Sequence, residues 1–157
     1  MRISKALLFS AAAIGMTLAG CASTSTGTIK DQANRLTPCS GAPHCVSSKS
    51  ATGSALHVDP FSFNGSREQA HAALLEVLRG QKDARIEADA MPMLHATFRT
   101  TIGFVDDVTF LFRDDASLID VKSNSRLGFY DFGVNRRRVE SLRTEFSRAM
   151  AEVEPAK

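Results

Sequence analysis

The sequence predicts an α+β domain of two layers, a four-stranded antiparallel meander with an N-terminal and a C-terminal helix packed on one face. Four consecutive runs between residues 84 and 123 alternate apolar and polar side chains, as half-buried strands do. A segment with apolar residues at helical spacing lies on each side of these runs. The 157-residue chain is long enough for one domain, which we place at residues 36–157.

The first twenty residues are typical of a signal peptide. Arg2 and Lys5 give a basic start, and residues 6–17 are apolar and uncharged. This run is shorter than the roughly 20 residues that a membrane-spanning helix needs. Leu18-Ala-Gly-Cys21 resembles the lipobox of bacterial lipoproteins, which implies cleavage before Cys21 and lipid attachment to it. An ordinary signal peptide with a chance cysteine is the alternative, and the small residues before Cys21 disfavour it.

The lipoprotein resemblance also implies a location. Ala22 and Ser23 follow the cysteine, and the absence of Asp there indicates the outer membrane, with the domain facing the periplasm. Residues 21–35 then form the lipidated cysteine and a flexible tether, which spans about 20 Å on average. Removal of Arg2 and Lys5 with the signal balances the 19 Lys and Arg against the 17 Asp and Glu. Bulk charge therefore gives no reason to expect nucleic acid as a partner.

Cys39 and Cys45 are the two cysteines left once Cys21 is lipidated. An oxidising periplasm favours a disulfide between them. The alternative is a metal site formed by Cys39, His44 and Cys45. These three candidate ligands have an unusual spacing, so we expect no metal. The spacing also differs from the Cys-x-x-Cys of redox-active pairs.

The elements follow in order. Residues 55–63 are a short apolar segment broken by Pro60. Ser66 and Gln69 form a capping box for a helix over 67–79, with Gly80 as the glycine beyond its end. The strands are predicted at 84–89, 93–100, 104–113 and 118–123. A final helix is expected over 136–151, with Asn135 as its N-cap. Its apolar stripe consists of Val139, Leu142, Phe146, Ala149, Met150 and Val153.

The stretch from Ser123 to Arg138 concentrates the candidate chemistry. Three consecutive arginines at a helix N-terminus are unfavourable unless negative groups lie close to them. Asp106 and Asp107 lie in the third strand and face opposite ways, so we expect no paired-carboxylate catalysis. The candidate ligand-binding or structural cluster consists of Asp106, Asp107, Ser123, Ser125, Arg126, Asp131, Asn135, Arg136 and Arg138.

Two interpretations of this cluster stay open. In the structural one, Arg126 or Arg138 pairs with Asp106, which shares the core face of Val108, and the ion pairs fix the loop and the last helix on the sheet. In the functional one, the arginines and the helix N-terminus bind an external anion, such as a lipid headgroup or a sugar acid. The structural interpretation is favoured, because acids are available within the chain.

Three motifs are similar to those of the domain-of-unknown-function 1499 family. They are Pro-Cys-x5-Cys-Val-Ser-Ser at 38–48, Gly-Phe-Val-Asp-Asp-Val-x-Phe at 103–110, and the glycine- and arginine-rich run at 123–138. The resemblance spans about 36–150. Ala42-Pro43-His44 stands where the family tends to have Ser-Pro-Asn. The resemblance implies a bacterial envelope or organelle-lumen protein and no particular reaction, cofactor or site.

The sequence thus predicts a lipid-anchored envelope protein that acts as a non-catalytic binding or envelope-accessory module. We expect no catalytic residue and no cofactor. The expected partners are the membrane, through Cys21, and an anionic small molecule or lipid headgroup. The alternative is a hydrolase acting on an anionic envelope substrate in the same crevice. Such an enzyme needs a nucleophile or general base within about 3 Å of the reacting group.

Overall fold

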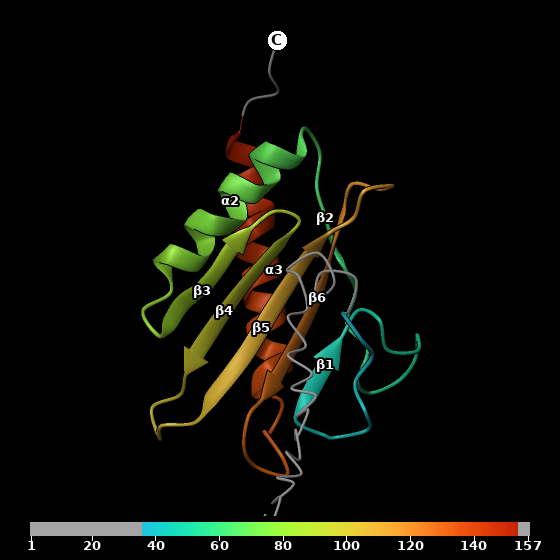
Figure 1. Ribbon diagram of the computed structural model, residues 1–157, viewed down its shortest axis with the longest axis vertical. Coiled ribbons are helices and arrows are strands. Elements are labelled where there is room, and N and C mark those ends of the chain that lie inside the picture. The colour runs from blue at the N-terminus through green and yellow to red at the C-terminus, as the bar shows by residue number, and fades with distance from the viewer. Residues whose placement is uncertain (1–35, 154–157) are drawn as a thin grey trace, which may run out of the picture.

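The computed structural model describes residues 36–153, which form an antiparallel sheet with two helices on one of its faces (Figure 1). The predicted α+β class, antiparallel sheet and C-terminal helix are confirmed. The signal peptide, Cys21 and the tether lie outside the described residues. The elements in chain order are β1 (Cys45–Ser47), β2 (Phe61–Ser62), α2 (Arg67–Gly80), β3 (Ala84–Ala90), β4 (Met93–Arg99), β5 (Val105–Phe112), β6 (Leu118–Ser125) and α3 (Val134–Glu152).

The sheet has six strands where the sequence predicted four. The meander β3–β6 is present as expected, in the order β1-β6-β5-β4-β3, and β2 pairs with β6. The added strands are two and three residues long, too short to show an alternating pattern. Both precede α2, so the first helix is not the first element of the described domain. Their antiparallel pairing with β6, for example Val46 with Ser123, covers an edge that the meander alone would leave open.

The first helix begins as predicted and ends one residue later. The Ser66 side chain accepts from the Gln69 amide, and the Gln69 side chain accepts from the Ser66 amide, which completes the capping box. Gly80 is the last residue of α2 and not the residue beyond it. Gln81 ends the helix in extended conformation, and its amide donates to the Leu78 carbonyl. A left-handed glycine is therefore not needed at this end.

The prediction that Asn135 is the N-cap of the last helix is wrong. The cap is Gly133, whose φ of 74° lies in the left-handed region that favours glycine, and the helix begins at Val134. Asn135 is the second helical residue and is completely buried. Asparagine is a common N-cap residue, and the prediction relied on this preference. Here the side-chain amide of Asn135 forms tertiary hydrogen bonds.

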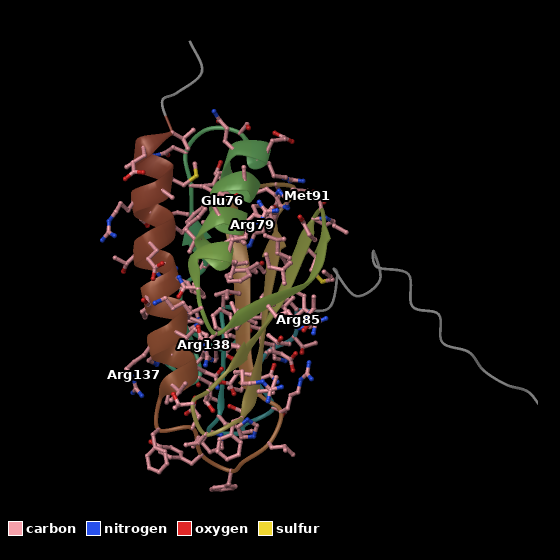
Figure 2. All side chains as sticks on the ribbon, turned by 90° about the vertical axis from the view of Figure 1, so that its left-hand side faces the viewer. Glu76, Arg79, Arg85, Met91, Arg137 and Arg138 are labelled. Atoms are coloured by element: carbon pink, nitrogen blue, oxygen red, sulfur yellow. A yellow bond between two sulfur atoms is a disulfide. The ribbon has the colours of Figure 1, made fainter. Side chains whose placement is uncertain are left out.

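The core lies between the sheet and the helices, which cover the same face (Figure 2). Phe61 is at its centre, with ring centroids 5.6 Å from Phe110 and 5.7 Å from Phe146. The predicted stripe of α3 packs here through Val139, Leu142 and Phe146. Within residues 36–153, no helix has the length and apolar character required to cross a membrane.

Candidate functional site

The predicted disulfide is present. Cys39 and Cys45 are bonded, with their Cα atoms 5.8 Å apart, so neither sulfur is available as a thiolate ligand for a metal. The bond joins the N-terminal segment to the first residue of β1. Across the described part of the chain, no group of three or more His, Cys, Asp or Glu side chains is arranged to hold a metal ion.

The predicted cluster is divided between the two faces of the sheet. Asp106 is buried on the helix-covered face, opposite Ser125 in the register of β5 and β6. Asp107, the next residue, is directed to the other face and pairs with Asn124 in the register. The strand period of two causes this separation, as the sequence predicted. The inner group consists of Asp106, Ser123, Ser125, Asp131, Asn135 and Arg138, and the outer group of Asp107 and Arg126.

A buried ion pair forms the centre of the inner group. Arg138 Nη2 lies 2.6 Å from Asp106 Oδ2, and the two side chains are 9% and 2% exposed. The guanidinium also lies over the Phe98 ring, 4.8 Å from its centroid. This pair connects α3 to β5, as the structural interpretation of the cluster required.

Asn135 connects the start of α3 to the strands. Its Oδ1 accepts from the Ser123 hydroxyl and from Arg138 Nη1. Its Nδ2 is within 3.1 Å of the His44 carbonyl and 3.0 Å of Ser125 Oγ and Asp131 Oδ2, so two N–H groups serve three acceptors. Both serine hydroxyls are therefore bonded to the amide that positions the helix, and they are not arranged as activated nucleophiles.

Asp131 supplies the negative charge at the helix N-terminus. Its Oδ1 accepts from the Gly133 amide and its Oδ2 from the Asn135 amide, both at 2.9 Å. Burial raises the pKa of Asp131, but the hydrogen bonds from Asn135 and Gly133 outweigh this, and the pKa lies below its usual value. A carboxylate here compensates both the helix dipole and the neighbouring arginines. Arg136 is satisfied separately, because its Nη2 donates to the carbonyls of Ala55 and His57.

The outer group is a half-exposed ion pair with a histidine. Arg126 donates from Nε and Nη2 to the two oxygens of Asp107, at 2.8 and 2.9 Å. His95 Nε2 lies 3.0 Å from Asp107 Oδ1. The hydrogen bonds from Arg126, with a smaller contribution from His95, lower the pKa of Asp107. Arg126 therefore does not pair with Asp106, which was one of its two predicted roles.

A pocket of about 200 Å³ lies between the loops at residues 100–104 and 126–133. Its walls are mainly apolar, and its polar lining residues are Thr100, Asp106, Ser125 and Asp131. Asp106 Oδ1 is completely buried and accepts no hydrogen bond from the residues that the structure describes. Arg138 thus satisfies Oδ2 of this carboxylate, and Oδ1 is left without a donor in a residue that lines the pocket. The apolar lining residues are Ile102, Phe104, Leu127, Tyr130, Phe132 and Val134.

The sequence reasoning missed these apolar loop residues. It treated residues 123–138 as a source of charges and overlooked the large apolar residues near Gly128 and Gly133, which are Leu127, Phe129, Tyr130 and Phe132. Loops of this kind are usually polar, so four large apolar residues in six positions were a usable signal. Both glycines have positive φ, 104° at Gly128 and 74° at Gly133, which confirms that the segment is a loop.

The comparison with protein families identifies the chain. The family model described as "Protein of unknown function (DUF1499)" matches residues 35–146, more than half of the chain, and the chain belongs to this family. The match confirms the resemblance drawn from the three motifs. Neither the curated proteins nor the solved structures contain a match to the chain.

Proposed function

We propose that this is a lipid-anchored envelope protein whose domain is a non-catalytic binding module for a small amphiphile. The ligand places an apolar body between the two loops and a hydrogen-bond donor on Asp106. One observation carries the proposal: Asp106, which lines an apolar pocket, has a buried Oδ1 without a hydrogen-bond donor. The lipobox-like sequence at Cys21 and the disulfide of an oxidising compartment support the envelope location.

The unpaired oxygen argues for a ligand on energetic grounds. A buried acceptor without a donor destabilises a fold by about 1–3 kcal/mol. Most buried polar groups in native proteins are satisfied. Arg138 satisfies only the other oxygen of this carboxylate. A donor supplied by a ligand would recover the lost interaction and fix the orientation of the ligand.

The charges at the pocket determine which head group fits. The arginines of the cluster are engaged by Asp106, Asp107 or backbone carbonyls, so they are not directed at this pocket. The polar side chains that do line it include two carboxylates, Asp106 and Asp131. An anionic head would be repelled by both. An amine, hydroxyl or amide N–H is favoured, and the anion proposed from the sequence does not suit this pocket.

A series of ligands with one tail and different heads tests this proposal. A pocket of about 200 Å³ accommodates a tail of the size of an octyl group. We expect octylamine and octanol to bind more tightly than octanoate when each is titrated by calorimetry. Equal binding of all three, or tighter binding of octanoate, would refute the role of Asp106.

The variant Asp106→Asn tests whether the carboxylate selects the head group. Its side-chain amide keeps one oxygen for Arg138 and directs an NH₂ donor to the pocket. The variant is expected to lose octylamine binding and to gain octanoate binding. Asp107→Asn, the neighbouring change on the outer face, is the matched control and leaves the preference unaltered. Leu127→Ala, which leaves the ion pair intact, weakens the binding of all three ligands. Thermal melting verifies that each variant is folded.

A further inference from the structure

A cluster of exposed apolar side chains forms one end of the molecule. The loops at 100–104 and 126–133 lie side by side at the same end of the sheet (Figure 1). Their side chains project beyond the sheet and the helices (Figure 2). Soluble proteins rarely gather exposed apolar groups in one place unless the surface binds something. We call this set the apolar tip: Ile102, Phe104, Leu127, Phe129, Tyr130 and Phe132, which are 45–84% exposed.

One residue of the tip has an unfavourable backbone conformation. Phe132 has a φ of 53°, in the left-handed region that glycine occupies far more readily than phenylalanine. Its side chain is 77% exposed, so little burial compensates for this conformation. Residues held in such conformations cluster at functional sites, where the fold supports them for another purpose.

A cationic groove lies beside the tip. It has a volume of about 640 Å³ and is lined by four basic residues, Lys82, Arg85, Arg99 and Arg126, against two acids, Asp83 and Glu87. Thr100 lines both this groove and the apolar pocket, so the two surfaces are continuous. Lys82 and Arg99 are exposed, and neither forms an ion pair within residues 36–153.

The two acids that line the apolar pocket, Asp106 and Asp131, are directed inwards. Asp131 is the single acid within the two loops, and its oxygens accept from the start of α3. Asp106 is buried against Arg138. The outward charge beside the apolar tip is therefore mainly positive.

We propose that the apolar tip docks on an anionic lipid bilayer, with its rings among the acyl chains and the cationic groove against the headgroup phosphates. Apolar groups that enter the interface and basic residues beside them bind peripheral proteins to such surfaces. Together with the proposed lipid on Cys21, this contact would hold the domain in one orientation. Five of the six tip residues also line the pocket, but Phe129 does not, so this residue can be changed without altering the pocket lining.

Vesicle sedimentation tests the docking. The chain from Ala22 to Lys157 retains all described residues and excludes any contribution from Cys21. It is expected to bind vesicles of phosphatidylethanolamine and phosphatidylglycerol, and to bind vesicles of phosphatidylcholine much less. Phe129→Ser should weaken partition about tenfold or more, since a phenyl side chain leaves the apolar phase. Arg99→Gln should weaken it about fivefold, and added salt should weaken it further.

Two controls isolate the tip. Met91→Ser removes an exposed apolar side chain at the opposite end of the molecule (Figure 2), and Arg148→Gln removes an exposed charge near the end of α3. Both variants should bind to the anionic vesicles with a partition coefficient within twofold of the wild-type value. No binding of the wild type to anionic vesicles, or equal effects of Phe129→Ser and Met91→Ser, would overturn the proposal.

Light scattering in the absence of vesicles tests the main competitor. If the wild type forms a dimer that Phe129→Ser dissociates, and if it does not bind vesicles, then the tip binds a second copy of the chain. This result would overturn the proposal that the tip docks on a bilayer. The octylamine titration separates the two proposals. Phe129→Ser is expected to bind octylamine like the wild type even when it no longer binds vesicles.

Discussion

At the scale of single residues, the ion pair of Arg138 with Asp106 is expected to be important for stability. Both partners are almost completely removed from solvent. The attraction of such a pair is offset by the desolvation of both ions, so its net contribution is modest. Removal of one partner is different, because it leaves a buried charge without compensation.

We therefore expect Arg138→Ala to lower the free energy of unfolding by about 3–5 kcal/mol. Arg126→Ala is the matched control, because its pair with Asp107 is half-exposed and screened by solvent, and is expected to contribute much less. Urea denaturation measures both. Similar small losses in the two variants would mean that Asp106 is not a buried charge that depends on Arg138.

The role of Asn135 could not be predicted from the residues next to it in the sequence. The sequence identified the right residue as important but gave it the wrong role. Asp131, three residues before the start of the helix, accepts from the Gly133 and Asn135 amides, and Gly133, the N-cap, accommodates the left-handed turn. The Asn135 side chain is then free to bond Ser123 and Ser125. Nothing local distinguishes an asparagine that caps a helix from one that enters the interior, because the difference depends on strands that are distant in sequence.

At the scale of elements, a second buried carboxylate holds the N-terminal segment on the sheet. Asp120 in β6 accepts from Arg113 after β5 and from Ser48 after β1, and it lies 2.6 Å from Lys49 Nζ. Burial raises its pKa, but the hydrogen bonds from Arg113, Lys49 and Ser48 outweigh this and hold the pKa at about 2. The unfolded chain has the ordinary pKa of 3.8, so the folded state binds this proton more weakly.

The pH dependence of stability follows from this difference. Above pH 4 the ionised Asp120 stabilises the fold by about 2 kcal/mol, and this contribution disappears as the pH falls from about 4 to 2. We expect Asp120→Asn to be less stable than the wild type at pH 7 and to lose less stability over that acid range. Denaturation curves at several pH values measure the effect. Asp114→Asn, an exposed acid paired with Arg67, is the control, and an equal acid dependence in both variants would contradict the assignment.

The helices and strands differ in how far they can be predicted from the sequence. The four long strands and both helices appeared in the sequence because seven or more residues repeat a pattern, or because a capping box marks a start. The strands β1 and β2 did not, since their structure depends on pairing with β6. The inward orientation of Asp106 was predicted from strand alternation. The apolar tip was not, because the exposure of Phe129 or Phe132 depends on how two loops meet.

At the scale of the whole molecule, the proposals describe a domain attached to a membrane by its N-terminal lipid and oriented by its apolar tip. The first of these attachments rests on Cys21. We expect the wild-type chain to incorporate labelled palmitate in a bacterial host and to fractionate with membranes, and Cys21→Ser to lose the label. Cys39→Ser is the control, since it changes a cysteine that belongs to the disulfide. Label retained in Cys21→Ser would refute lipid attachment at this residue.

The most direct test of the account is a crystal structure of the domain grown with octylamine. We predict the ligand nitrogen within about 3.2 Å of Asp106 Oδ1, with the alkyl chain between Phe104 and Phe132 and the Arg138 ion pair retained. A pocket filled by its own loop side chains, or octylamine bound only elsewhere, would contradict the claim that this carboxylate recognises a ligand.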